Sequence, residues 1–423
     1  MSALSSQYRS SVLSSGMKLI TLKMPARRAV QVGIIIRVGS RDAPDSGLPH
    51  FLEHMLFKGT DKRNAFNIFY EIEKVGGWLN GHTSQESTSF YSMVPADQME
   101  TAVDILLDLI SSPTFPEDQI KKEKGVVLEE IGHIENSSSA RAWEKFPKIL
   151  WDGHPLSNSI IGTRQEVKEF TRQDILNFYK ANYTAPNTFF VGVGAVEHQQ
   201  LKEMIEKRSD KLNRNPVNLN RTPPPSHSPQ SVHEFMDTTQ LHIVTGRPVF
   251  SFADKRRYPF ELLNSILASE RDSSRLFQLL REEHGLVYGV YGLTKYFTDA
   301  GFYGINLATS PNLLEQTLDI LKEELKRLPG SLTQDELDAT KLYIRGQTMI
   351  ESEELTVLFW RLTGLEKLLG TYFSLEEELE KIEQVKLSEL KQIAEQFLNP
   401  DHFSSVIVGK RSDKKKGGES QGK

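Results

Sequence analysis

The 423-residue sequence contains no cysteine. Disulfide bonds and thiolate ligands are therefore excluded, and any bound metal must be held by histidine, aspartate or glutamate. The chain also lacks the run of roughly 20 apolar residues that a membrane span needs. Its net charge is only −5, so neither nucleic acid nor a membrane surface is expected as a partner.

The N-terminal segment lacks the apolar core of a signal peptide. Residues 1–16 are rich in serine and free of acidic residues, and a segment typical of a β-strand follows at once. We therefore expect the mature protein to begin near residue 1 and to be cytoplasmic. At the other end, residues 410–423 form a basic, low-complexity tail that we predict to be disordered.

A chain of this length exceeds one typical core and predicts two or more domains. The clearest boundary is the polar stretch 216–230, because its three consecutive prolines cannot continue a helix or a central strand. We predict a first domain over residues 1–215 and a second over residues 231–409.

The hydrophobic pattern of the first domain alternates between two kinds of segment. Strands are predicted where β-branched and aromatic residues concentrate, over residues 17–24, 29–38, 87–94 and 189–196. Helices are predicted over residues 99–135, with a break at Ser111-Ser112-Pro113, and over 166–182 and 199–211. This mixture indicates an α+β fold.

Residues 50–54 read His-Phe-Leu-Glu-His. On a helix, positions i, i+3 and i+4 lie on one face, so His50, Glu53 and His54 project together while the apolar neighbours face the core. Two imidazoles one turn apart suit tetrahedral zinc, and the carboxylate between them can accept a proton from a water that zinc activates. The H-x-x-E-H pattern is a known peptidase signature. The alternative is an ordinary surface helix, since chance produces the motif in roughly two chains per hundred of this composition.

A catalytic zinc needs a third protein ligand and an open position for water. The predicted helix downstream offers four glutamates: Glu123, Glu129, Glu130 and Glu135. Glu123 and Glu130 are seven residues apart and share one stripe of the helix, whereas Glu129 is turned by roughly 100°. We predict Glu130 as the ligand, with Glu129 as the alternative. Glu123 is then either a carboxylate that orients a histidine ligand or a solvated helix charge.

Three further histidines are not expected to bind metal. His133 lies one turn from Glu130 and is interpreted as a residue of the polar helix face. His82 and His154 have loop-like surroundings and no partner at metal-ligand spacing, so we expect structural or solvent-exposed roles for both.

The second domain resembles the first in sequence. Residues 47–56 match residues 259–267, and four further segment pairs follow in the same order, which predicts an internal duplication. The alignment replaces the candidate site residues as follows: Glu53 by Asn264, His54 by Ser265 and Glu130 by Gln347. We therefore expect one zinc per chain, held in the first domain.

With HFLEHMLFKGT at residues 50–60 and VVLEEI around Glu130, the chain resembles the insulinase and mitochondrial processing peptidase family, also called pitrilysin-type or inverzincin metallopeptidases. The resemblance covers roughly residues 15–410. It implies two homologous α/β-sandwich domains, with mostly antiparallel sheets and helices. It further implies that His50, His54 and Glu130 bind zinc, that Glu53 activates the water and that Glu123 supports the site from behind.

The resemblance also implies how a substrate is held. In the family, the strand equivalent to the one around Asn80 lines an extended peptide. The usual Asn-Ala-aromatic-Thr pattern reads Asn80-Gly81-His82-Thr83 here, a departure that affects substrate contacts and not the chemistry. Family members also use an arginine and a tyrosine seven residues apart, here Arg281 and Tyr288, to hold the substrate carbonyl and stabilise the oxyanion.

Two-domain relatives pair two chains into a clamshell around a closed chamber. Because this chain carries both the zinc motif and the Arg281/Tyr288 pair, a homodimer is the simpler expectation and a heterodimer the alternative. We expect a zinc-dependent metalloendopeptidase that cuts peptides or unfolded segments inside this chamber. The alternatives are the catalytic subunit of a heterodimeric processing peptidase that matures a peptide precursor, and a non-catalytic scaffold, against which the intact zinc motif argues.

Overall fold

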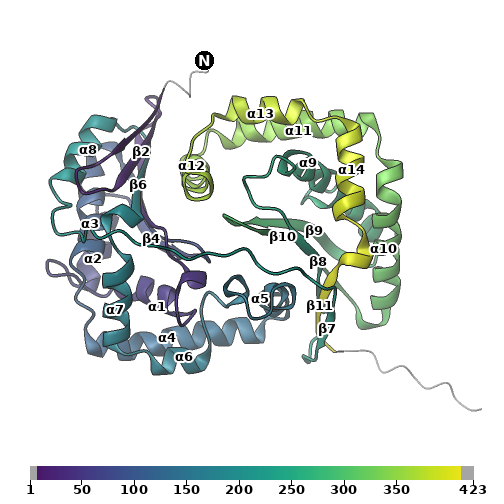
Figure 1. Ribbon diagram of the computed structural model, residues 1–423, viewed down its shortest axis with the longest axis horizontal. Coiled ribbons are helices and arrows are strands. Elements are labelled where there is room, and N and C mark those ends of the chain that lie inside the picture. Colours follow the sequence, from purple (N-terminus) through teal and green to yellow (C-terminus); the bar gives the residue numbers. More distant parts are fainter. Residues whose placement is uncertain (1–6, 411–423) are drawn as a thin grey trace, which may run out of the picture.

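The computed structural model describes residues 7–410, which form two halves that each contain a β-sheet and helices (Figure 1). The expected start near residue 1 and the predicted tail beyond Lys410 lie outside the described residues. Within the described range, no helix has the length and apolar character to cross a membrane.

The first sheet has six strands in the spatial order β1-β2-β6-β3-β5-β4. All neighbours in it are antiparallel except β2 and β6. Its strands are β1 (Tyr8–Val12), β2 (Lys18–Lys23), β3 (Ala29–Ile36), β4 (Trp78–Thr83), β5 (Thr88–Pro95) and β6 (Thr188–Gly194). The α-helices of this half of the chain are α1 (Leu48–Leu56), α2 (Ala65–Glu73), α3 (Met99–Ser111), α4 (Glu117–Asn136), α5 (Ser138–Leu150), α6 (Arg164–Glu169), α7 (Arg172–Asn182) and α8 (His198–Glu206).

The second sheet has five strands in the order β7-β11-β8-β10-β9, and only β7 and β11 are parallel. Its strands are β7 (Ser231–Glu234), β8 (Leu241–Val249), β9 (Val287–Tyr296), β10 (Gly301–Thr309) and β11 (Ser404–Val408). The α-helices of this half are α9 (Arg257–Ala268), α10 (Leu314–Ser331), α11 (Gln334–Glu351), α12 (Leu355–Leu369), α13 (Leu375–Glu383) and α14 (Leu387–Phe397). A π-helical segment, η6 (Phe277–Glu283), precedes β9, and single 3₁₀ turns span Ser40–Asp42, Ala96–Gln98, Pro155–Ser157, Ala185–Asn187, Pro311–Leu313 and Pro400–His402.

The two sheets share one topology. Without β1, the first sheet reads β2-β6-β3-β5-β4, which corresponds strand by strand to β7-β11-β8-β10-β9. Each is a mixed sheet with a single parallel pair, so the structure contains the two α/β domains that the sequence predicts. The shared order supports the internal duplication, while the limits of the linker at 216–230 remain a prediction.

Most predicted elements of the first half are found. The break after α3 lies at the predicted serines and proline, and α4 begins only at Glu117. The prediction of a single helix over residues 166–182 is wrong. Two helices, α6 and α7, occupy this region because the Thr171 side chain caps a new helix, accepting a hydrogen bond from the main-chain N–H of Asp174. The helix predicted over residues 199–211 is shorter than expected, since α8 ends at Glu206.

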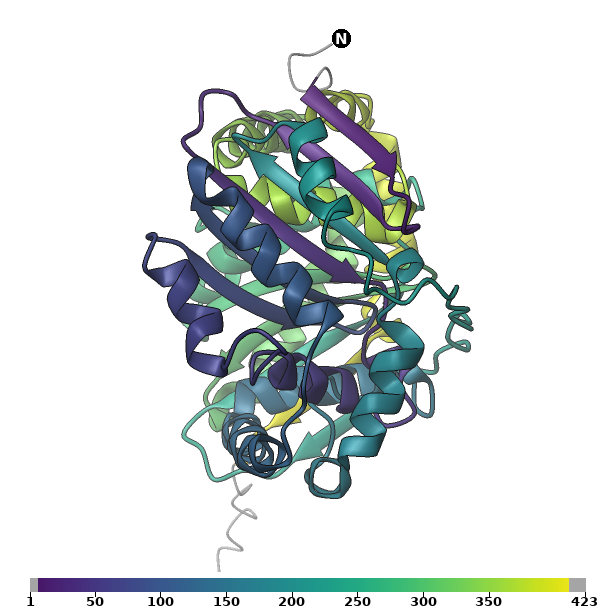
Figure 2. The ribbon, with the colours of Figure 1, turned by 90° about the vertical axis from the view of Figure 1, so that its left-hand side faces the viewer.

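The first sheet is covered on both faces. Helices α3 and α8 pack on its outer face, and Figure 2 shows helices of the first half in front of the strands. The inner face is covered by α12, which comes from the other half of the chain and packs on β3 and β6. Phe359 of α12 is fully buried there, and a side chain at Gly33 of β3 would collide with it.

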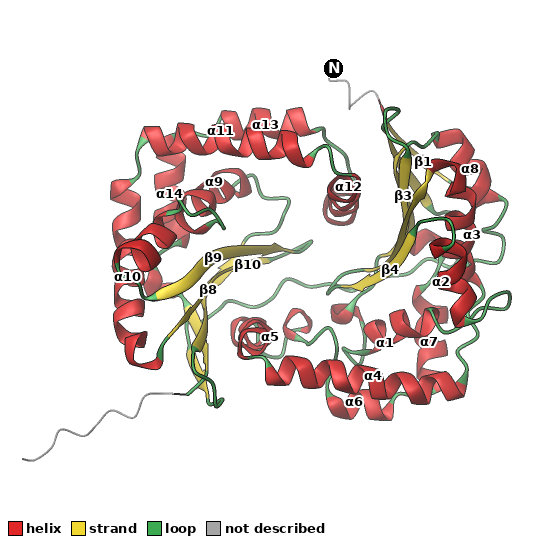
Figure 3. Ribbon diagram, turned by 180° about the vertical axis from the view of Figure 1, so that it is seen from behind, coloured by secondary structure: helices red, strands yellow, loops and turns green. Residues whose placement is uncertain are grey.

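The second sheet is likewise covered by a helix from the opposite half. Helix α5 belongs to the first half in sequence but packs on β8 and β11 of the second sheet. Phe146 and Leu150 of α5 join a buried cluster that includes Phe302 and Val406 of that sheet. Figures 1 and 3 show α5 and α12 between the two halves. Each sheet therefore depends on the opposite half for one of its faces.

A buried ion cluster also joins the halves. The Arg41 guanidinium donates hydrogen bonds to Glu86 at 2.6 Å and to Asp299 at 2.9 Å. The side chains of Arg41 and Glu86 are each only 2% exposed. Glu86 also accepts from the Thr298 hydroxyl at 2.6 Å. Because Glu86 lies between β4 and β5, and Thr298 and Asp299 lie between β9 and β10, the equivalent hairpin ends of the two halves meet here.

This cluster makes a prediction about stability. Arg41→Ala removes the main counter-charge of the buried Glu86 and of the partly buried Asp299 and leaves Glu86 only Arg221, at 3.5 Å. Breaking a buried pair in this way costs about 3–5 kcal/mol. We expect the free energy of unfolding, measured by chemical denaturation, to fall by that amount. Lys122→Ala is the control, because Lys122 and Asp118 form an exposed pair, and it should cost less than about 0.5 kcal/mol. Equal effects of the two substitutions would show that the cluster does not hold the halves together.

Candidate metal centre

Helix α1 presents one face to the core and the other to the site. Four apolar side chains on the core face have no exposed surface: Phe51, Leu52, Met55 and Leu56. Their burial fixes the rotation of the helix about its axis. His50, Glu53 and His54 therefore project together from the opposite side, the arrangement that the i, i+3, i+4 spacing predicts.

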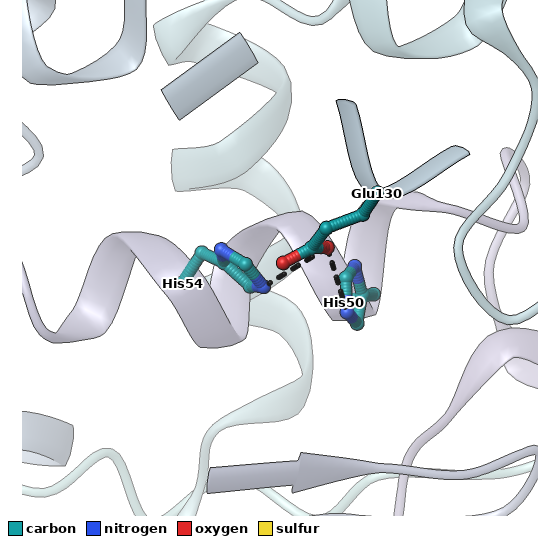
Figure 4. A group of neighbouring side chains, drawn as sticks. All are labelled: His50, His54 and Glu130. Carbon is teal, nitrogen blue, oxygen red and sulfur yellow. Dashed lines mark ion pairs between the residues drawn. The ribbon is translucent and has the colours of Figure 1, made fainter. Parts of the chain in front are cut away.

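The Glu130 carboxylate of α4 points at both imidazoles (Figure 4). Its Oε2 lies 3.9 Å from His50 Nε2 and 3.7 Å from His54 Nε2. The three ligand atoms all lie within 4.8 Å of one another. Tetrahedral zinc with bonds of about 2.0–2.1 Å separates its ligand atoms by about 3.3–3.4 Å. Small side-chain movements are enough for this group to hold zinc, so the residues fit the metal.

No other group of three or more potential ligands is found within residues 7–410. Glu129 is exposed and turned away from the two histidines, while Glu135 is paired with Arg164 at 2.6 Å. His133 is exposed, as predicted for the polar face of α4. The equivalent positions of the second half carry Asn264, Ser265 and Gln347, and no such group occurs there.

Glu123 lies behind His54. Its Oε1 is 2.8 Å from His54 Nδ1, and its Oε2 is 2.7 Å from Lys58 Nζ. Burial raises the pKa of Glu123, but the hydrogen bonds from His54 and Lys58 outweigh burial, and the net pKa lies below its usual value. An ionised Glu123 must accept from Nδ1–H, which leaves Nε2 of His54 with its lone pair facing Glu130. The structure thus places Glu123 at hydrogen-bonding distance behind His54, and its role in orienting that imidazole stays a prediction.

Burial is the largest influence on the pKa values of His50 and Glu53. Burial, followed by the charges of His54 and His82, lowers the pKa of His50 to about 3, so this imidazole is neutral and able to coordinate. Burial raises the pKa of Glu53 to about 7, although the Thr83 hydrogen bond and His54 oppose this rise. A carboxyl group whose pKa lies near neutrality suits proton exchange with a substrate or water.

Glu53 is held from the side of β4. The Thr83 hydroxyl donates to its Oε2 at 2.5 Å, and a side chain at Gly81 would collide with its carboxylate. The absence of a side chain at Gly81 therefore leaves room for the Glu53 carboxylate. Asn80 is exposed on the same strand, and its Oδ1 accepts from the main-chain N–H of Gly81 at 2.8 Å. Because β4 ends the sheet, its outer edge lies beside the site.

Arg281 and Tyr288 lie together on the second half. The Arg281 guanidinium carbon is 5.1 Å from the centre of the Tyr288 ring, and Tyr288 is 81% exposed. Within the described chain, no hydrogen bond, ion pair or ring contact joins either residue to the His-His-Glu group. The structure therefore brings the pair together but separately from the metal centre of the same chain.

The two remaining histidines differ. His154 is buried and contacts its own loop: its Nε2 lies 2.9 Å from the Thr222 carbonyl oxygen, and its Nδ1 accepts from the main-chain N–H of Leu156. This is the structural role predicted for it. His82 lies on β4, close enough for its charge to act on His50, and not in the loop expected from the sequence. The alternation of side chains along residues 78–83 would have indicated this strand, since Gly81 and Thr83 face Glu53 and His82 must face the other way.

Comparison with known proteins identifies the class. Residues 18–164 match the family model described as "Insulinase (Peptidase family M16)", and residues 169–343 match the model described as "Peptidase M16 inactive domain". The chain is 30% identical over 408 residues to an uncharacterized zinc protease of Rickettsia bellii, covering 95% of this chain and 97% of that protein. It is also 30% identical to the uncharacterized zinc protease YmxG of Bacillus subtilis, with coverages of 93% and 96%.

Solved structures show the same fold. A structure described as the peptidase M16 inactive domain from Pseudomonas fluorescens aligns with a TM-score of 0.88 at 21% identity, over 96% of this chain and 99% of that one. A protease from Helicobacter pylori aligns with a TM-score of 0.87, also at 21% identity, over 95% and 99% of the two chains. Duplicated α/β domains with a single His-His-Glu group define a two-domain protein of the metallopeptidase type. The chain belongs to the peptidase M16, or insulinase, family.

The choice between the neighbouring glutamates of α4 can be tested by zinc content. Glu130→Gln removes a carboxylate that faces both histidines and should weaken zinc binding at least tenfold, whereas Glu129→Gln changes only an exposed side chain and should leave it unaltered. Inductively coupled plasma mass spectrometry after dialysis against buffered zinc measures both. The reverse ranking would mean that Glu129 is the ligand.

Proposed function

We propose that the protein is a zinc-dependent metalloendopeptidase that hydrolyses peptides or unfolded polypeptide segments. The observation that carries this proposal is the buried Glu53 carboxylate, which lies on the same helix face as His50 and His54, opposite Glu130. The family membership and the zinc protease names of the relatives support it.

Each residue has a distinct task in this proposal. His50, His54 and Glu130 hold the metal, and Glu123 keeps His54 in the tautomer that presents Nε2. A zinc ion held by these three residues would supply Lewis acidity toward a water and toward the scissile carbonyl. Glu53 accepts a proton from the attacking water and later donates it to the leaving amine, and its raised pKa suits both directions of transfer.

The unpaired edge of β4 is the proposed place for the substrate. An extended peptide can add to an exposed sheet edge, because the edge strand offers main-chain N–H and C=O groups that have no partner. Asn80 is exposed on β4, and the Glu53 carboxylate lies against Gly81 of the same strand. A peptide paired with β4 would therefore pass beside the proposed base.

A second copy of the chain completes the site in this proposal. Arg281 and Tyr288 form an exposed pair that makes no contact with the metal centre of their own chain, and donors aimed at a developing oxyanion are usually a large part of catalysis. Two chains facing each other in a clamshell would bring this pair of one copy to the metal centre of the other.

The catalytic assignment is tested by separating metal binding from turnover. His50→Ala should lose zinc and activity together, because it removes a ligand. Glu53→Gln should retain zinc and lose at least 100-fold in kcat, since general base catalysis contributes about 10²–10⁴-fold. Chelation should abolish cleavage of a peptide library followed by mass spectrometry, and zinc should restore it. Undiminished cleavage by metal-free protein, or by Glu53→Gln, would refute the assignment.

The shared site is tested by mixing inactive variants. Glu53→Gln retains a good Arg281/Tyr288 pair, and the double variant Arg281→Ala, Tyr288→Phe retains a good metal centre. Each alone should be nearly inactive, because one lost oxyanion donor costs about 100–1,000-fold. After subunit exchange, half of the dimers are mixed and contain one intact site of two, so recovery should approach about a quarter of wild-type activity. A mixture of Glu53→Gln with His50→Ala is the control and should recover nothing. Absence of recovery despite demonstrated exchange would show that each chain builds its own site.

A further inference from the structure

Two half-buried lysines lie between the halves without an acidic partner. The ammonium groups of Lys295 on β9 and Lys367 on α12 make no hydrogen bond and no ion pair within residues 7–410, and Lys295 contacts only the ring of Phe297, whose centre is 6.0 Å from its Nζ. Burial, followed by the charge of Lys367, lowers the pKa of Lys295 to about 8. Burial also lowers the pKa of Lys367. A half-buried ammonium group without a counter-charge is costly to desolvate, so an anionic ligand beside it would be stabilising.

The acidic groups whose charge reaches these lysines are already paired. Glu144 of α5 acts on Lys295, but its carboxylate is 3.5 Å from Lys148. Glu86 acts on Lys367, but it is bound to Arg41 in the buried cluster between the halves. The two lysines therefore retain an unbalanced positive charge.

Lys367 lines a pocket between β4 and α12, which we name the β4–α12 pocket. It has a volume of about 370 Å³. Three of its lining residues carry rings: His82 of β4, Tyr91 of β5 and Trp360 of α12. The Trp360 ring centre is 5.8 Å from that of His82 and 4.9 Å from that of Tyr91. The pocket thus combines aromatic rings, which can pack against the CH₂ groups of a ligand side chain, with the positive charge of Lys367.

The pocket lies next to the metal centre. His82 belongs to the same strand as Gly81 and Thr83, which contact Glu53. His82 therefore lies on β4 between two residues that contact the proposed base, and its side chain projects from the opposite face of the strand.

We propose that the β4–α12 pocket binds a carboxylate of the peptide substrate, and that Lys367, which lines the pocket, selects for it. This inference rests on the proposed peptidase function. A peptide that pairs with β4 presents every second side chain to the face of the sheet on which His82 lies. A glutamate or aspartate side chain, or the C-terminal carboxylate of a short peptide, would supply the missing counter-charge through charge-assisted hydrogen bonds.

The test uses matched peptides. One series replaces a single glutamine by glutamate at each position flanking a known cleavage site, and a second series differs only in a C-terminal acid or amide. We expect kcat/KM to rise about tenfold for the acidic member at one position, the effect of one charged hydrogen bond. The series that shows the preference distinguishes a side-chain carboxylate from a chain terminus.

Variants assign the preference to Lys367. Lys367→Met should bring the ratio of kcat/KM for the acidic and neutral peptides close to one. Lys322→Met is the matched control, because Lys322 is exposed on α10 and has no ion pair in the described chain, and it should keep the wild-type ratio. Thermal unfolding of the Lys367→Met protein should show a Tm that is unchanged or raised, since methionine removes a charge that has no ion-pair partner. A lowered Tm with an unchanged ratio would give Lys367 a structural role and overturn the inference.

A binding measurement separates this inference from the proposed function. Fluorescence anisotropy of labelled peptides with the Glu53→Gln protein reports affinity without cleavage, and the acidic peptide should bind about tenfold more tightly. Tighter binding of the acidic peptide without any cleavage by the wild-type protein would contradict the peptidase proposal alone. Cleavage of acidic and neutral peptides at equal rates, with equal affinities, would overturn the carboxylate pocket and leave the peptidase proposal intact.

Discussion

The burial of one face of α1 determines where the metal centre can form. Because Phe51, Leu52, Met55 and Leu56 have no exposed surface, the helix cannot rotate without exposing apolar area at a cost of about 25 cal/mol per Å². That cost keeps the two histidines directed toward α4. The same apolar contacts that stabilise the first half therefore also preorganise the ligands, which need no change of helix orientation to meet Glu130.

Polar contacts hold the site residues of α1 from two sides, one from α4 and one from β4. Glu123 receives hydrogen bonds from His54 and Lys58, so a negative charge lies behind a coordinating imidazole. Thr83 and Gly81 of β4 hold Glu53 on the other side. A helix supplies the ligands and an edge strand positions the base, so an extended peptide along that strand would meet both at once.

The sequence was sufficient for features that depend on local periodicity. The spacing of His50, Glu53 and His54, and the seven-residue step from Glu123 to Glu130, predict the helix faces on which the structure places them. The single helix predicted over 166–182 was wrong because a side-chain cap at Thr171 is stronger than the apolar pattern that continues through it.

Features that depend on distant parts of the chain could not be predicted in this way. Lys367 is unremarkable in sequence, and only the packing of α12 on the first sheet places it in one pocket with His82.

The exchange of α5 and α12 between the halves has a consequence for synthesis on the ribosome. All six strands of the first sheet are complete once β6 has been made, yet the sheet lacks its inner cover until α12 emerges, after four of the five strands of the second sheet. The N-terminal half cannot finish folding ahead of the rest, so this nascent chain carries an open apolar sheet face, a binding site for chaperones, from the completion of β6 at Gly194 until α12 (Leu355–Leu369) has been made.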